Sequence, residues 1–189
     1  MRRGNFHFEL RRKLFHLFFG LSLIFILIHS GRGNLIIFLS LFLAAGSIAI
    51  VLMKHGRRIP LAGWFEVKFE REDVRFPGYG AFWFVVGALL IALSLSEANE
   101  ISAALMVMAA GDSAATIFGV KGSHPLPHNR LKTAEGSAAF FIFSLSSCIF
   151  IGWQGAALAL LGAVVESLAT PVDDNLMVPV AMILFFLLI

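Results

Sequence analysis

The chain has 189 residues, of which 58% are hydrophobic and only 14% are charged. A soluble domain of this size is typically about half apolar and about a quarter charged, so the composition excludes an ordinary soluble domain. The formal net charge of +3 does not indicate nucleic-acid binding, because the basic residues flank apolar segments.

Apolar blocks of roughly 15–20 residues, the length that spans the hydrocarbon core of a bilayer, recur along the chain. They predict an all-α, polytopic membrane bundle in which residues 1–189 form a single integral membrane domain. We expect seven transmembrane helices, at residues 14–29, 35–53, 79–96, 101–119, 136–153, 155–170 and 176–189.

The basic residues indicate the orientation of the bundle. Fourteen of the 15 Lys and Arg residues lie in the arm 1–13, the loop 54–78 or the loop 120–135, and only Arg32 lies on the opposite side. By the positive-inside rule, these three segments and the amino terminus are cytoplasmic. Within the loop 54–78, apolar and charged residues alternate from Phe65 to Glu70, which predicts a short strand or an interfacial hairpin.

Asp112 is the most informative residue, because it lies in the otherwise apolar run 101–119. A carboxylate at that depth needs a compensating partner. One interpretation is Mg²⁺ with bound phosphates, which needs the carboxylate as a ligand and the nearby Gly119 and Gly122 for close approach. The alternative is a structural ion pair with Lys or Arg, which explains the carboxylate but not the glycines. Glu166, a second carboxylate within an expected span, leaves the same two alternatives open.

Two basic clusters lie on the same side of the bundle as Asp112. Glu9, Arg12, Lys13 and His16 share one face of a helix. On that face Arg12, Lys13 and His16 can hold a phosphate, with Glu9 orienting a base, or the basic residues can simply anchor the first span.

The second cluster precedes the fifth span. Arg130 and Lys132 are candidate phosphate ligands, and Thr133 is expected to cap the helix, whose free amide groups attract anions. Glu135 and Gly136 follow directly. An ordinary helix cap with a basic flank is the alternative interpretation.

The turn after the sixth span carries Asp173, Asp174 and Asn175. Their oxygens suit a hard cation, although a solvated turn that caps the next helix is equally compatible with them. Walker-type and dinucleotide-binding glycine motifs are both absent from the sequence, so a nucleotide would require another scaffold.

Taken in order, these motifs resemble the CTP-dependent lipid-alcohol kinases, which include dolichol kinase, phytol kinase and the yeast-type diacylglycerol kinase. The resemblance runs from residue 9 to residue 179 and rests on Glu-x-x-Arg-Lys-x-x-His (9–16), Asp-x-x-Ala-x-x-x-Gly (112–119), Lys-Thr-x-Glu-Gly (132–136) and Glu166 with Asp174-Asn175. The related phosphatidate cytidylyltransferases share the middle motifs but end in a different signature, which favours the kinases. The short chain is similar to a compact prokaryotic version.

The resemblance implies a multi-pass enzyme of the prokaryotic plasma membrane, with its active site facing the cytoplasm. It implies CTP as phosphoryl donor, Mg²⁺ or another divalent cation as cofactor, and an isoprenoid alcohol or a diacylglycerol-like lipid as acceptor. The expected catalytic residues are Asp112, Glu166 and His16, and the expected metal ligands are Asp112, Glu135, Glu166 and Asp174, with Glu9 and Asn175 in supporting positions. The expected nucleotide and phosphate ligands are Arg12, Lys13, Gly119, Lys121, Gly122, Arg130, Lys132, Thr133 and Gly136.

Two other functions are compatible with parts of the pattern. A cytidylyltransferase would make a CDP-lipid and release pyrophosphate. A small transporter would place carboxylates along a cation path, but such a path needs polar residues through the full depth of the bundle, and here they gather at one end.

Overall fold

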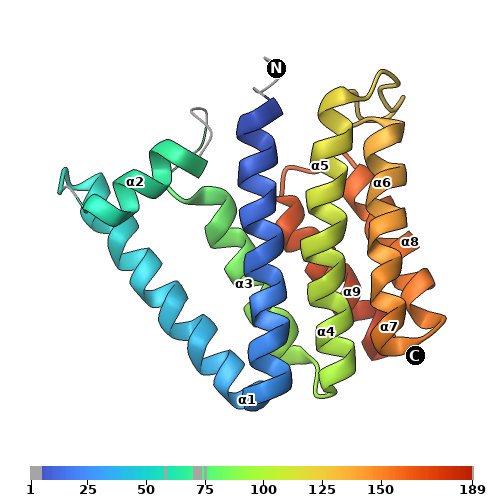
Figure 1. The fold of residues 1–189 in the computed structure, drawn as a ribbon, viewed down its shortest axis with the longest axis horizontal. Helices are drawn as coiled ribbons and strands as arrows, with labels where there is room; N and C mark the ends of the chain where they lie inside the picture. The colour runs from blue at the N-terminus through green and yellow to red at the C-terminus, as the bar shows by residue number, and fades with distance from the viewer. Residues whose placement is uncertain (1–5, 58, 70–73, 75, 189) are drawn as a thin grey trace.

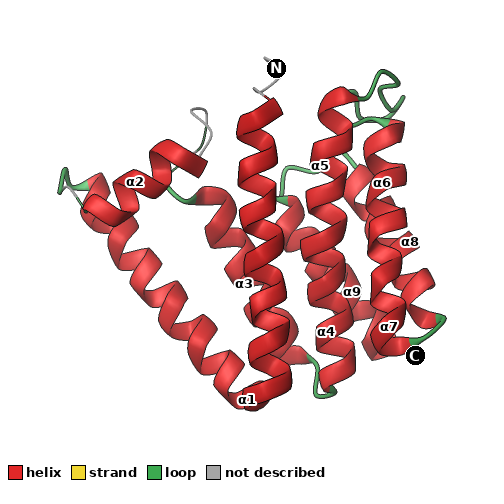
Figure 2. Cartoon of the chain, viewed as in Figure 1, coloured by secondary structure: helices red, strands yellow, loops and turns green. Residues whose placement is uncertain are grey.

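The computed structural model describes residues 6–57, 59–69, 74 and 76–188, and its elements are all helices (Figures 1 and 2). Arg2, Arg3, Arg58, Arg71 and Arg75 of the predicted cytoplasmic segments lie outside these residues. The elements are α1 (Phe6–Lys54), α2 (Pro60–Phe69), α3 (Tyr79–Ser94), α4 (Ala98–Met106), η1 (Val107–Gly111), α5 (Asp112–Lys121), α6 (Ala134–Ser144), η2 (Leu145–Ser147), α7 (Cys148–Ile151), α8 (Gln154–Ser167) and α9 (Asp174–Leu188).

The structure is that of a helical membrane-type protein. Three helical stretches are long and apolar enough to cross a bilayer, namely Phe6–Lys54, Ala98–Lys121 and Ala134–Ile151, and three shorter apolar helices accompany them. Large apolar side chains such as Phe18 and Ile149 are exposed on the outside, where a bilayer would receive them. The number of crossings and the cytoplasmic orientation stay predictions.

The first two expected spans are the two arms of one bent helix. Gly31 has φ of 81° and ψ of 167°, a conformation that glycine adopts at little cost, and it interrupts α1. Arg32 fixes the bend, because its Nε donates to Ala92 O at 2.8 Å and its Nη2 to Leu93 O at 2.9 Å, at the end of α3. The second arm diverges from the rest of the bundle (Figure 1). The only basic residue assigned to the far side therefore has a structural role.

The predicted strand or hairpin is wrong for residues 64–69, which belong to α2. Phe65 and Phe69 are four residues apart and both contact Phe15 of α1, with ring centroids 5.0 and 5.1 Å from its ring. This spacing is that of one helical face, and contact with α1 outweighs the alternating pattern. Residues 70–73 of the expected hairpin lie outside the described residues.

Close packing of helices depends on small residues at their crossings. A Cβ atom on Gly20 would overlap Ala109, so α1 approaches η1 closely at this point. A Cβ atom on Gly87 of α3 would overlap the backbone of Asn175 and the ring of Pro179 in α9. This second crossing brings α9, with its amino-terminal polar residues, against the core.

Gly87→Ala tests that packing. We expect this substitution to lower the free energy of unfolding by about 1–3 kcal/mol, because the added methyl group has no space beside α9. Gly46→Ala is the matched control, since nothing lies within 4 Å of a Cβ at Gly46 in α1 and alanine favours a helix by about 1 kcal/mol. Unfolding in detergent measures both effects, and equal stability of the two variants would contradict the crossing.

Candidate functional site

A π-helical turn directly precedes Asp112. The stretch Ala98–Lys121 is helical throughout, but the segment η1, Val107–Gly111, is wound as a π-helix. Such turns are rare and are frequently found at functional sites. Gly111 at its end packs tightly, since a Cβ there would overlap Ser144 Oγ and the ring of Phe140. The sequence gives no signal for this change of winding.

Asp112 is held by two side chains of α1. Lys13 donates a hydrogen bond to Asp112 Oδ2, and His16 Nε2 lies 3.1 Å from the same oxygen, within ion-pair distance but without the angles of a hydrogen bond. Ser113 Oγ donates to Lys13 O at 3.0 Å, which ties the backbone of α1 to α5. Because Lys13 is buried, the ion pair compensates a carboxylate and an ammonium that would otherwise be very unfavourable in an apolar bundle.

A second ion-pair group is centred on Lys132. Its Nζ donates to Glu166 Oε1 and to Asp174 Oδ2, each at 2.5 Å. Burial lowers the pKa of Lys132, but the two adjacent carboxylates outweigh burial and raise this pKa overall, so the side chain stays protonated. Glu166 is buried, and its other oxygen, Oε2, has no hydrogen-bond partner among the described residues.

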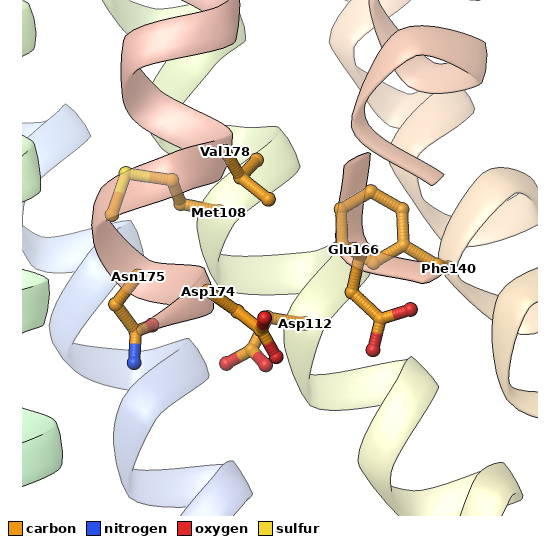
Figure 3. A pocket seen from close by; sticks show the side chains of 7 residues that line it. All are labelled: Met108, Asp112, Phe140, Glu166, Asp174, Asn175 and Val178. Atoms are coloured by element: carbon orange, nitrogen blue, oxygen red, sulfur yellow. The ribbon is translucent and has the colours of Figure 1, made fainter. Parts of the chain in front are cut away.

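The two groups line one cleft between helices. Asp112, Glu166, Asp174 and Asn175 line it, and Figure 3 shows Asp112 and Asp174 between Asn175 and Glu166. Its apolar walls are Met108, Phe140 and Val178. The free space is about 10 Å³, which is room for about one water molecule. Asp112 of α5 therefore meets residues of α8 and α9, two helices that are close in sequence to each other but far from α5.

The loop before α6 is anchored so that Lys132 reaches this cleft. The side-chain amide of buried Asn129 donates to Ser167 O and Leu168 O, both at 3.1 Å, where α8 ends. Its Oδ1 accepts from Leu131 N at 3.2 Å. Asn129 is a positioning residue that the sequence pattern did not single out, because nothing in its local sequence indicates contact with a helix 38 residues later.

Thr133 caps α6 as expected, with its hydroxyl accepting from Gly136 N at 3.2 Å. Gly119 and Gly136 allow α5 and α6 to pack closely, since a Cβ on Gly136 would lie 2.9 Å from Ala115 O and 3.2 Å from Gly119 Cα. A Cβ on Gly122 would overlap Thr133 and Glu135. Packing thus accounts for Gly122 and Gly136, whereas a Cβ on Gly119 would make only ordinary contacts, 3.5 Å from Thr133 Oγ1 and 3.6 Å from Gly136 Cα.

Glu135 is placed apart from the other carboxylates. Its Oε1 accepts from Ser123 N at 2.8 Å and lies 2.7 Å from His124 Nδ1, so the side chain fastens the start of the loop. It is not among the residues that line the cleft. The structure therefore brings together Asp112, Glu166 and Asp174 of the expected metal ligands and leaves Glu135 at the loop.

The remaining candidates lie around the site. Arg12 is bound to Glu9, whose Oε2 accepts from its Nη2 at 2.7 Å. Lys121 lies over the ring of Phe6, 3.8 Å from the centroid, and Arg130 is exposed. Asn175 lines the cleft and donates to Asp173 Oδ1 at 2.9 Å.

The cleft offers ligands for a cation, but lysines occupy them. Across the described parts of the chain, no three His, Cys, Asp or Glu side chains form a group that could hold a metal ion. Carboxylate and amide oxygens are nevertheless the donors that Mg²⁺ prefers, and Glu166 Oε2 is one such oxygen that has no hydrogen-bond partner within the described part of the chain. The donor chemistry therefore fits a divalent cation once the lysines are drawn to another anion.

Fold and site together define a helical membrane-type protein with a buried, ion-paired polar cleft. The uncharacterized protein MJ1137 of Methanocaldococcus jannaschii is 34% identical over 177 residues, which cover 90% of this chain and 88% of that protein. The chain belongs to the same family as this protein.

A second relative is the probable phytol kinase, chloroplastic, of Triticum aestivum, which is 35% identical over 131 residues. The match covers 58% of this chain and less than half, 44%, of that protein. The similarity to this protein is therefore partial in both chains. No protein-family model matches the chain, and no solved structure matches it.

Lys132→Met tests the second ion-pair group. Loss of the cation leaves Glu166 and Asp174 facing each other without compensation. We expect a loss of about 2–3 kcal/mol in the free energy of unfolding, less than for a fully buried pair because the Lys132 side chain is 27% exposed. Denaturant unfolding in detergent measures the loss, and Arg130→Met, at an exposed cation in the same loop, is the control. A loss of the same size in both variants would argue against the bridge.

Proposed function

We propose that this protein is a membrane kinase that transfers the γ-phosphoryl group of CTP to the hydroxyl group of a lipid alcohol. The observation that carries the proposal is the single cleft in which Asp112, Glu166 and Asp174 meet, with Lys13 and Lys132 as their partners. The similarity to a probable phytol kinase supports phosphoryl transfer to an isoprenoid alcohol, and a diacylglycerol-like lipid is the other acceptor class. The choice of CTP rests on the motif resemblance.

Phosphoryl transfer depends mainly on positioning and on neutralising charge, which suits these side chains. Lys13 and Lys132 would bind phosphate oxygens, and Asp112, Glu166 and Asp174 would hold Mg²⁺. The ion supplies neutralisation of the phosphate charge when it is bound. In the structure each lysine is bound to carboxylates. When a magnesium–nucleotide complex binds, the lysines would turn from the carboxylates to the phosphates, and the carboxylates would turn from the lysines to Mg²⁺. Every buried charge would then still have a partner of opposite charge.

The acceptor hydroxyl group must lose its proton during the transfer. Asp112, Glu166 and His16 are candidates for the base, and all three lie in or beside the cleft. A lipid would approach sideways from the bilayer and the nucleotide from the cytoplasm, at the plasma membrane. Arg12, Lys121 and Arg130 remain proposed phosphate ligands, and to bind a phosphate Arg12 would have to leave Glu9 and Lys121 would have to leave the ring of Phe6.

The products distinguish this proposal from its alternative. The purified protein in detergent is incubated with labelled CTP, Mg²⁺ and a panel of lipid alcohols and lipid phosphates. We expect CDP and a lipid phosphate. Pyrophosphate with a CDP-lipid would identify a cytidylyltransferase instead, and the absence of both reactions, with no binding of CTP–Mg²⁺, would overturn enzymatic function at this cleft.

Asp112→Asn is the most direct substitution. The amide keeps an acceptor for Lys13 but leaves the charge of that lysine uncompensated, so we expect a lower free energy of unfolding in a protein that still folds. The rate should fall at least about a hundredfold, because the charge that would hold Mg²⁺ is lost. Glu100→Gln is the matched control, because Glu100 lies in the first turn of α4, at the other end of the same helical stretch. Steady-state kinetics and thermal unfolding are measured on both variants. Full activity in a folded Asp112→Asn protein would remove Asp112 from the mechanism.

A further inference from the structure

A continuous row of aromatic rings leads from the cleft to the surface of the bundle. His16, beside Asp112, contacts the ring of Phe84 with centroids 4.0 Å apart. From Phe84 the row continues to Phe19 at 5.8 Å, to Phe42 at 5.3 Å and to Phe38 at 6.0 Å. We call these five side chains the aromatic row.

The aromatic row connects a buried ring to exposed ones, since Phe84 is 1% exposed whereas Phe42 and Phe38 at its far end are 45% and 36% exposed. Phe84 belongs to α3, Phe19 on the first arm of α1 is partly buried, and Phe42 lies on the second arm. The bend at Gly31 divides α1 into two arms (Figure 1), and the row joins them, because Phe19 of the first arm contacts Phe42 of the second. Beyond Leu39, no residue from Ser40 to Lys54 is buried, so this part of the arm is open to the surrounding hydrocarbon.

We propose that the hydrocarbon chain of the lipid substrate lies along the aromatic row, with its hydroxyl group at His16 and Asp112. This inference rests on the proposed function and adds the place where the acceptor binds. His16 joins the two environments, since its ring contacts the ring of Phe84 while its Nε2 lies 3.1 Å from Asp112 Oδ2. A lipid alcohol requires such a junction, because its polar end reacts in the cleft while its chain must remain in an apolar environment.

A second pair of rings shows that exposure alone does not define this site. Phe118 and Phe143 are 5.7 Å apart and are both about half exposed, Phe143 at 46%. Both members of that pair lie at the surface. Phe42 is exposed to the same extent as Phe143, but ring contacts connect Phe42 through Phe19 and Phe84 to His16. A side chain that only faces bilayer lipid does not need such a connection to the cleft.

Phe42→Ala and Phe143→Ala form a matched test, since their exposure is nearly the same. Kinetics are measured with a long-chain and a short-chain isoprenoid alcohol. For Phe42→Ala we expect the ratio of kcat/KM for the long chain to that for the short chain to fall roughly tenfold, through KM rather than kcat, because chain contacts are lost. Phe143→Ala should keep the wild-type ratio. An unchanged ratio in Phe42→Ala, or the same change in both variants, would overturn the inference.

A binding measurement separates this inference from the proposed kinase activity. The wild-type protein is photolabelled with an isoprenoid alcohol that carries a diazirine on its chain, and the labelled peptides are identified. We expect label on 38–42, displaced by unlabelled long-chain alcohol. Displaceable label there without phosphorylation of any lipid would keep the aromatic row as a binding site and reject the kinase. Phosphorylation with label elsewhere, or without displacement, would reject the aromatic row and keep the kinase.

Discussion

The ion pair between Lys13 and Asp112 is the interaction on which the structure of the site depends. Both side chains lie within an apolar bundle, where either charge alone would be strongly unfavourable. Their pairing brings α1 against α5, and Ser113 reinforces the same contact by donating to Lys13 O. The need to pair the two charges also sets the position of α1 along α5, because Lys13 must lie at the depth of Asp112. His16, one turn further along α1, is thereby placed beside the same carboxylate.

The polar residues could be predicted from the sequence, because a charge inside a long apolar segment needs a partner wherever the helices pack. Asp112 and Glu166 were singled out on this basis, Lys132 was singled out as a candidate phosphate ligand in a basic loop, and Thr133 was correctly expected to cap α6. The alternative of a Lys–Asp pair also describes what the structure shows at Asp112. Which lysine meets which carboxylate could not be predicted, since the partners are separated by 99 residues in one case and 34 in the other.

Other features depend on tertiary packing and leave no trace in local sequence. The π-helical turn at Val107–Gly111 has the composition of an ordinary apolar helix. Asn129 donates to backbone carbonyl oxygens at the end of α8. In the sequence it cannot be distinguished from any other polar residue in a loop. In α2, contact of two aromatic rings with Phe15 decides the conformation, whereas the alternating pattern pointed to a strand. Glu135 was expected to be a metal ligand because it belongs to the motif Lys-Thr-x-Glu-Gly, but hydrogen bonds to the loop hold it away from the cleft.

Charge balance connects the closed cleft to the proposed chemistry. Three carboxylates line a space of about 10 Å³ and two lysines neutralise most of their charge. A divalent cation alone would compete with these lysines, and phosphates alone would compete with the carboxylates. The two together would satisfy both sets of side chains, which is why the proposed ligand is a metal–nucleotide complex. The proposed kinase therefore requires joint binding of cation and nucleotide, and the ion pairs stabilise the cleft while both are absent.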